Sequence, residues 1–152
     1  MYHAMVKQKT RRVYQRLSAG DYESFLPSFS PKVRFHFLGD HALGGRLDDR
    51  DQVHRWFIRL FKIFPDLQLQ PESIVVDGFP WDTRVATRFA VSAALPDGGR
   101  YVNKGMQFIR LRWGRVVEDL YYEDTQALSA ALAEIAASGN QEADAPPLGE
   151  RS

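Results

Sequence analysis

The chain has 152 residues, 44% of them hydrophobic and 26% charged, which is the composition of one ordinary soluble domain. The formal net charge is only +1, which is too weak a field to gather nucleic acids, so we expect no nucleic-acid partner. Cysteine is absent, and this excludes disulfides, thiol catalysis and cysteine-ligated metal sites.

The sequence also indicates where the protein works. Basic residues between Lys7 and Arg12 interrupt any apolar run near the first residue, which is unlike a secretion signal. No apolar run approaches the length that a membrane-spanning helix needs. We therefore expect a cytoplasmic protein with no membrane partner.

The N-terminal region has the pattern of two helices. Apolar residues recur at helical spacing over residues 2–17, and Gly20 ends that helix. Asp21 is placed to cap a second, short helix, which Pro31 closes. The pattern predicts a helical hairpin before the first strand.

A strand and the strongest helix pattern of the chain come next. Aromatic and polar side chains alternate over residues 32–38, which predicts a strand with one aromatic face. After a Gly-rich loop, Asp49 and Gln52 have the spacing of a capping box. Apolar residues then recur every three or four positions as far as Phe64, and Pro65 ends the helix.

The following region predicts strands. The first, within residues 67–76, contains Pro71, which belongs at a sheet edge or at a bulge. Further strands are expected over residues 83–95, 100–111 and 116–122, with short turns between them. Short connections favour antiparallel neighbours, so these three strands should form a meander.

A closing helix and a tail complete the chain. Asp124 is placed to cap the helix, whose apolar residues have helical spacing. Residues 139–152 consist mainly of Gly, Pro, Ala and charged residues, which predicts a disordered tail. We therefore expect one domain, residues 1–138.

The order of these elements indicates an α+β fold. Together with the loop 39–45, the segment 64–67 and the ending 114–118, it resembles the nuclear-transport-factor-2-like (ketosteroid-isomerase-like) superfamily, and its SnoaL-like branch above all. Segments 78–85 and 101–103 resemble a bacterial subgroup of that superfamily. The resemblance implies a cone-shaped, curved antiparallel sheet wrapped around N-terminal helices, a cystatin-like α+β barrel.

The resemblance also implies a hydrophobic pocket inside the cone and a homodimer that pairs through the outer sheet face. Members of the superfamily include ketosteroid isomerases, polyketide cyclases, dehydratases, epoxide hydrolases and non-catalytic binding proteins, so the fold alone does not choose an activity.

Strand parity selects the first catalytic candidates. Counted from Gly114 as in the family, the last strand points its odd-numbered residues into the cone, namely Val117, Asp119, Tyr121 and Glu123. Asp119 would be a desolvated carboxylate suited to acid/base work; the alternative is a buried hydrogen bond or an ion pair with Arg110 or Arg112.

Tyr121 occupies the position at which SnoaL-like cyclases resemble one another in having an acid/base aspartate. A phenol can donate a hydrogen bond to a developing oxyanion, although a core tyrosine with a satisfied hydroxyl is the alternative.

Asp40 and His41 are candidates in the loop after the first strand. Asp40 lies at about the position where ketosteroid isomerases carry their proton-transferring aspartate, and His41 could act as a general base at the pocket mouth. The alternatives are an aspartate that bonds to the local turn backbone and a solvated loop histidine.

Substrate-binding candidates come from the neighbouring strand and from the aromatic faces. Gln107 matches the place of the isomerases' protonated aspartate, whereas the position of their oxyanion tyrosine aligns with Val13, next to Tyr14, so steroid-type isomerisation is disfavoured. The other candidates are Asn103, Trp56, Phe57 and Phe35; for Trp56 and Phe57 the alternative is a core side chain.

The sequence contains no metal-ligand spacing motif, and we expect neither a metal nor another cofactor. Two hypotheses remain. One is an acid/base enzyme of isomerase, cyclase or dehydratase type that acts on a small hydrophobic, carbonyl-bearing molecule. The other is a module of the same fold that binds a small molecule or assembles as a dimer without catalysis.

Overall fold

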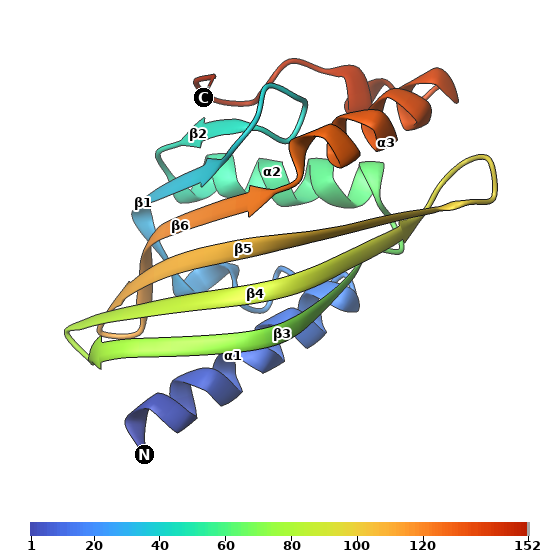
Figure 1. Ribbon diagram of the computed structural model, residues 1–152. Coiled ribbons are helices and arrows are strands. Elements are labelled where there is room, and N and C mark those ends of the chain that lie inside the picture. Colours follow the sequence, from blue (N-terminus) through green and yellow to red (C-terminus); the bar gives the residue numbers. More distant parts are fainter. Residues whose placement is uncertain (152) are drawn as a thin grey trace.

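The computed structural model describes residues 1–151, and a single curved, unclosed sheet of six strands dominates it, in the order β2-β1-β6-β5-β4-β3. Helices α1 and α2 lie on one side of the sheet, and no helix of the described chain covers its other face (Figure 1). The elements in chain order are α1 (Tyr2–Ser18), the 3₁₀ turn η1 (Leu26–Ser28), β1 (Phe29–Phe37), β2 (Gly45–Leu47), α2 (Arg50–Ile63), β3 (Gln68–Phe79), β4 (Asp82–Ala94), β5 (Arg100–Arg112), β6 (Arg115–Glu123), α3 (Thr125–Ala137) and the 3₁₀ turn η2 (Gln141–Asp144).

The expected α+β fold is confirmed, with one correction to the sheet. Strands β4 to β6 form the predicted antiparallel meander, and β3 extends it at the sheet edge. Strand β1 pairs with β6 in parallel, so the sheet is mixed. A parallel pair needs a long crossover connection. Here the chain supplies it by passing through α2 and the whole meander between β1 and β6.

The capping box predicted for α2 is present. The Asp49 carboxylate accepts a hydrogen bond of 2.8 Å from the Gln52 backbone, and the Gln52 side chain accepts one of 2.9 Å from the Asp48 backbone. These bonds satisfy backbone donors at the start of the helix. The apolar face that follows places Trp56 and Phe57, each at most 3% exposed, inside the cone.

The predicted helical hairpin is absent. After α1, the chain makes only turns and the 3₁₀ turn η1 before β1 begins at Phe29. Pro27 lies inside this turn, and its lack of an N–H group prevents the hydrogen-bond ladder of an α-helix from continuing. Phe25 and Leu26 are nevertheless buried in the core, so the apolar pattern marked burial rather than a helix.

Two of the irregular strand pairings bear on the predictions. The register of β3 shifts between Pro71 and Ser73, on the edge strand, as Pro71 predicts. The register between β5 and β6 shifts as well, because Arg110 pairs with Glu118 whereas Leu111 pairs with Val116. This bulge buries Val116 in place of Val117, which corrects the predicted parity at that residue, while Asp119 and Tyr121 face inward as predicted.

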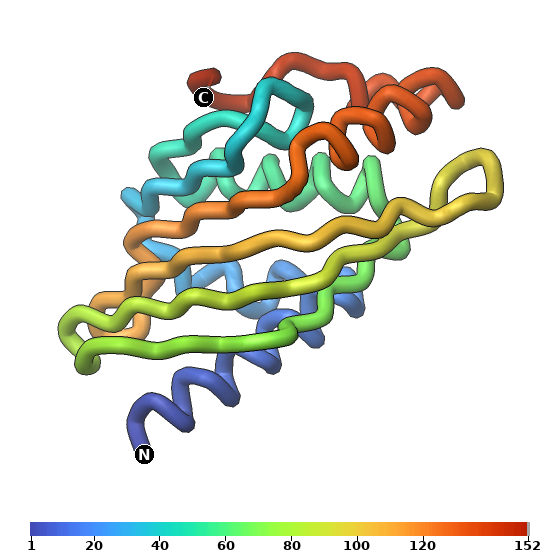
Figure 2. The backbone as a smooth tube through the Cα atoms, viewed as in Figure 1, coloured from blue at the N-terminus to red at the C-terminus, as the bar shows by residue number. Residues whose placement is uncertain are grey.

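The C-terminal segment 139–151 differs from the disordered tail that its composition predicts. It lies beside β2 (Figure 2), where the backbones of Arg46 and Glu150 exchange hydrogen bonds of 2.7 and 3.1 Å. The Arg59 guanidinium donates to the Glu142 carboxylate at 3.0 Å and to the Pro146 carbonyl at 2.8 Å. Composition gave no sign of these partners, because they lie far away in sequence.

Within residues 1–151 no helix combines the length and the apolar character that crossing a membrane requires.

Candidate functional site

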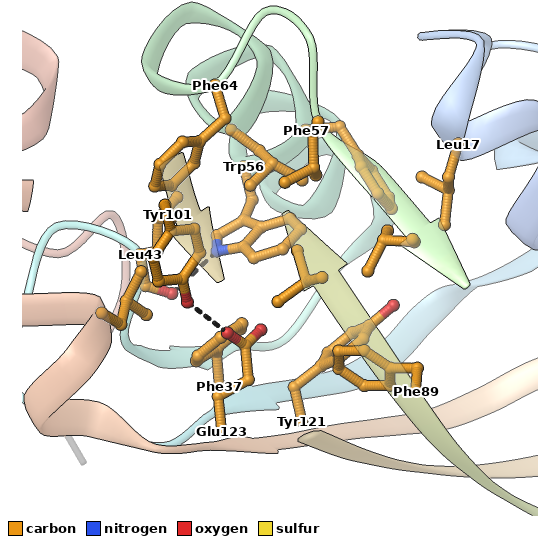
Figure 3. Close-up of a pocket in the computed structure, with 15 residues that line it drawn as sticks. Leu17, Phe37, Leu43, Trp56, Phe57, Phe64, Phe89, Tyr101, Tyr121 and Glu123 are labelled. Atoms are coloured by element: carbon orange, nitrogen blue, oxygen red, sulfur yellow. Dashed lines mark hydrogen bonds between the residues drawn. The ribbon is translucent and has the colours of Figure 1, made fainter. Parts of the chain in front are cut away.

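The interior of the cone contains a small cavity of about 30 Å³ between α1, α2, α3 and the sheet (Figure 3). This volume holds about two water molecules and is far below the several hundred Å³ of a typical ligand pocket. The wall is mainly Leu and Phe, together with Trp56, and three of its residues carry oxygen-bearing side chains: Tyr101, Tyr121 and Glu123.

Aromatic side chains fill most of the cone. The Trp56 indole donates a 2.8 Å hydrogen bond to the Leu43 carbonyl, which joins α2 to the loop before β2. Its ring centroid lies 4.7 Å from that of Phe35 and 5.2 Å from that of Phe57. Trp56 and Phe57 line the cavity as predicted, whereas Phe35 is not part of its wall. All three side chains are buried in the hydrophobic core.

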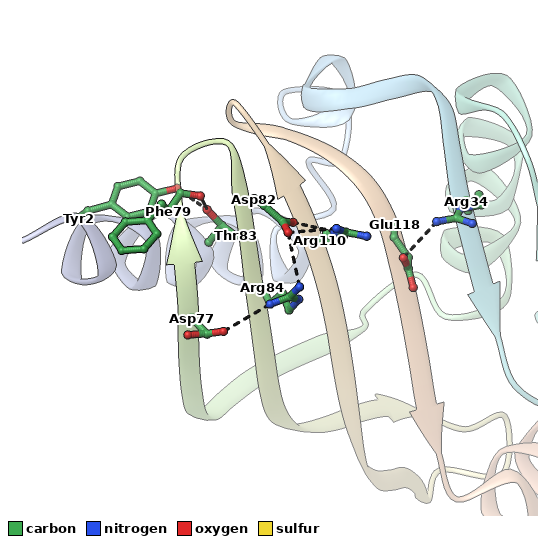
Figure 4. Close-up of polar contacts among 9 residues, drawn as sticks. All are labelled: Tyr2, Arg34, Asp77, Phe79, Asp82, Thr83, Arg84, Arg110 and Glu118. Atoms are coloured by element: carbon green, nitrogen blue, oxygen red, sulfur yellow. Dashed lines mark hydrogen bonds and ion pairs between the residues drawn. The ribbon is translucent and has the colours of Figure 1, made fainter.

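Asp119 is fully buried and has no cationic partner among the residues that the structure describes. Its Oδ1 accepts a hydrogen bond of 2.9 Å from Gln107 Nε2, and its Oδ2 has no partner within residues 1–151. The alternative of an ion pair with Arg110 or Arg112 is wrong: Arg110 instead binds Asp82 at 2.7 and 3.0 Å on the outer face (Figure 4). Burial raises the pKa of Asp119 to about 7, although the hydrogen bond from Gln107 acts to lower it.

Gln107 connects Asp119 to two tyrosines. Its Nε2 also donates to the Tyr121 hydroxyl at 2.8 Å, and its Oε1 accepts from the Tyr14 hydroxyl at 2.7 Å. We call these four residues the Gln107 network. Burial, assisted by the nearby Asp119, raises the pKa of Tyr121 well above its ordinary value, so the phenol is an uncharged donor.

Val13, the residue that the sequence aligns with the isomerases' oxyanion tyrosine, is only partly buried. Tyr14, next to it, is the inward residue of α1 and is 2% exposed. Its hydroxyl is bonded to Gln107 and does not reach the cavity wall. Because a helix turns 100° per residue, a shift of one position decides which side chain enters the core.

A second polar cluster surrounds Glu123, which strand parity placed inward but which was not among the predicted site residues. The Glu123 Oε1 accepts hydrogen bonds from the Tyr101 hydroxyl at 2.8 Å and from Asn103 Nδ2 at 3.3 Å. Asn103, a predicted substrate-binding residue, also bonds to the Asp124 carbonyl at 3.0 Å and does not line the cavity. Burial raises the pKa of Glu123 to about 7, more than these bonds lower it. Inward parity on the last strand was the signal that could have identified Glu123.

Asp40 and His41 lie outside this arrangement. The Asp40 side chain is 73% exposed and pairs with Arg151 at 3.4 Å, away from the cavity wall. The His41 ring accepts a hydrogen bond from the Leu43 backbone and contacts the Leu38 carbonyl, both at 3.2 Å, so it is tied to its own loop and is not the solvated histidine of the alternative. Burial lowers the pKa of His41, which favours the neutral ring.

Among residues 1–151 no group of three or more His, Asp and Glu side chains converges as metal ligands would. Of the four predicted catalytic residues, the structure brings together only Asp119 and Tyr121, through Gln107.

A sequence profile of the SnoaL-like domain matches residues 10–119 of this chain. The chain belongs to the SnoaL-like family. Among curated proteins, none matches it at a significant level.

Solved structures agree with the fold of this SnoaL-like chain. A candidate SnoaL-like polyketide cyclase from Jannaschia sp. CCS1 is 18% identical, with a TM-score of 0.70 over 85% of this chain and 92% of that one. An NTF2-like protein of unknown function from Burkholderia pseudomallei is 21% identical, with a TM-score of 0.70 over 82% and 95%. IdmH, a candidate polyketide cyclase from Streptomyces antibioticus, is 21% identical, with a TM-score of 0.64 over 80% and 93%. At these identities the likeness shows the fold alone, and the superfamily resemblance is confirmed.

Proposed function

We propose that this SnoaL-like protein catalyses proton transfer on a small, hydrophobic, carbonyl-bearing molecule bound inside the cone. The observation that carries the proposal is Asp119, a fully buried carboxyl whose Oδ2 has no partner within residues 1–151. Burying such a group without a cation costs several kcal/mol, which an apolar side chain would avoid. Buried carboxyl groups whose pKa is raised are concentrated at functional sites, which favours a catalytic role for Asp119.

The Gln107 network gives the substrate oxygen a donor. Gln107 already donates to the Tyr121 oxygen, which leaves the Tyr121 proton to be donated in turn. A ligand carbonyl in the cavity that Tyr121 lines would accept this proton in a hydrogen bond. That bond strengthens as negative charge develops on the oxygen during enolisation.

Binding requires the cavity to widen. Leu43 lines the cavity from the loop between β1 and β2, and two side chains of α2 hold this loop. Trp56 bonds to the Leu43 carbonyl at 2.8 Å, and Arg59 bonds to the Ala42 carbonyl at 2.9 Å. Leu43 belongs to a loop rather than to the sheet, so we propose that the cavity widens by movement of this segment, which requires these two bonds to break.

The proposal is tested by exchange of α-hydrogens for deuterium in uncharged ketones, from acetone to 2-tetralone, followed by proton NMR in D₂O. The protein should accelerate the exchange for at least one ketone, and Asp119→Asn should slow it while ketone binding is retained. Glu118→Gln is the matched control, because Glu118 lies on the same strand and pairs with Arg34 on the outer face (Figure 4). No acceleration, or full activity in Asp119→Asn, would contradict the proposal.

A non-catalytic dimeric module is the second candidate, and the small volume of the cavity favours it. Under either candidate we propose a homodimer through the outer sheet face, which no helix covers (Figure 1). The apolar side chains exposed there are Val75 (62%), Val102 (66%), Met106 (44%) and Tyr122 (46%). Ion pairs between neighbouring strands surround them, as between Arg84 and Asp77 at 3.5 Å (Figure 4). Such an apolar face with a polar surround is typical of an interface.

A further inference from the structure

We infer that Glu123 is the residue that exchanges a proton with the molecule bound in the cone, and that Tyr101 and Asn103 position its carboxyl. This inference rests on the proposed function and assigns the proton-transferring group within it. The cavity wall includes Tyr121 and Glu123, whereas Asp119 is not part of it. Asp119 therefore does not line the space that the bound molecule occupies. It acts on Tyr121 through Gln107.

The geometry leaves one oxygen of Glu123 available. Both hydrogen bonds that the carboxyl accepts from described side chains, from Tyr101 at 2.8 Å and from Asn103 at 3.3 Å, are made to Oε1. Among the described residues no side chain bonds to Oε2. Figure 3 shows the carboxyl directed from β6 toward Tyr101, beneath the indole of Trp56. A carboxyl held by one oxygen with the other free can approach a ligand without first breaking its own bonds.

Glu123 and Tyr121, both on β6, have different roles in the proposed reaction. The Glu123 carboxylate takes a proton from the carbon next to the carbonyl, and the electrons of the broken C–H bond form the C=C bond of an enolate. The negative charge moves to the carbonyl oxygen, where the Tyr121 hydroxyl donates to it. The protonated Glu123 then returns its proton to the same or another carbon, so no further reactant is needed. Burial raises the pKa of Glu123 to about 7, which suits a group that takes and returns a proton near neutrality.

The wall also selects the charge of the substrate. Its ionisable side chains are Glu123 and two tyrosines, and no Lys, Arg or His of the described chain lines the cavity. A carboxylate or phosphate on the ligand would meet a like charge in an apolar cavity without a cation to neutralise it. We therefore assign the substrate to uncharged carbonyl compounds.

The test measures α-hydrogen exchange in the same ketone panel, with the anion 4-oxopentanoate added. Glu123→Gln should lower the exchange rate about 100-fold or more, the usual contribution of a general base, whereas Glu118→Gln keeps it. The rate of the unaltered protein should rise with pH to a level value, with a midpoint near 7, and 4-oxopentanoate should exchange no faster than without protein. Thermal unfolding of each variant checks that it folds.

A second variant separates positioning from structure. Tyr101→Phe removes a hydrogen bond that stabilises the charged Glu123, so the midpoint of the pH profile should move upward; a merely structural role would leave it unchanged. If Glu123→Gln keeps the full rate while Asp119→Asn loses it, the inference is overturned and the proposed function stands. If the unaltered protein exchanges no ketone, both are overturned. Fast exchange of 4-oxopentanoate would overturn the assigned substrate class.

Discussion

Gln107 and Asp119 are joined across β5 and β6 by a hydrogen bond of 2.9 Å from the amide nitrogen to Oδ1. It is the single hydrogen bond of the Asp119 side chain within residues 1–151, because Oδ2 has no partner. A neutral amide stabilises a carboxylate less than an arginine would. Burial therefore prevails, and the carboxyl can hold its proton near neutral pH.

Stability should decrease as the pH rises through the range in which only the folded chain keeps the Asp119 proton. Below about pH 4 both states carry the proton, so the buried carboxyl imposes no penalty. Between about pH 4 and the folded pKa of about 7, the unfolded chain releases the proton and the folded chain retains it. The free energy of unfolding should fall there by up to about 4 kcal/mol for this group and level off above it.

Urea unfolding at about pH 5 and about pH 8 measures this decrease. Asp119→Asn keeps an oxygen to accept from Gln107 but does not titrate, so its decrease should be smaller than that of the unaltered protein. Glu118→Gln should retain the full decrease. Equal pH dependence with and without Asp119 would refute the raised pKa.

Tyr14→Phe should destabilise the fold by about 1–3 kcal/mol, because it leaves the buried Gln107 Oε1 without its 2.7 Å donor. Thermal or urea unfolding measures the change. Tyr122→Phe is the control: its side chain is 46% exposed, and the change should stay within about 0.5 kcal/mol. The same loss in both variants would mean that the Tyr14 hydroxyl contributes nothing specific.

Arg59→Ala should release the C-terminal segment. The Arg59 side chain is only 11% exposed and bonds to Glu142, to the Pro146 carbonyl and to the Ala42 carbonyl, so its removal leaves acceptors of two segments without a donor. We expect a loss of about 2 kcal/mol and faster amide hydrogen exchange over residues 141–151. Arg55→Ala, at an exposed position of the same helix, should change neither. Unchanged exchange in Arg59→Ala would show that other contacts hold the segment.

Met106→Glu should disrupt the proposed dimer. Met106 pairs with Tyr122 on the outer face, and an interface between two copies would bury the new carboxylate against apolar side chains. Light scattering should report a dimer for the unaltered protein and a monomer for the variant. A monomeric unaltered protein would rule out the dimer altogether.

Local signals predicted the fold better than they predicted the site. The capping box at Asp49 and the edge position of Pro71 follow from a few neighbouring residues, and both are present. The C-terminal segment depends on Arg59, which lies too far away in sequence for composition to reveal it.

The site required more than strand parity. Strand parity correctly predicted that Asp119 and Tyr121 face inward. Because of the bulge between β5 and β6, however, Val116 is buried instead of the predicted Val117. Neither the hydrogen bond that replaces an ion pair at Asp119 nor the proximity of Tyr101 to Glu123 can be derived from alternation, because both depend on the pairing of side chains across strands.

The most direct measurement is a carbon-13 NMR titration of the Asp119 and Glu123 side-chain carboxyls, assigned with Asp119→Asn and Glu123→Gln. Burial raises the pKa of each to about 7, so both carbons should titrate near neutrality and show protonated acids at about pH 5. Titration of both below about pH 4.5 would mean that the carboxyls are charged and solvated at neutral pH, which would contradict a proton-transfer site inside the cone.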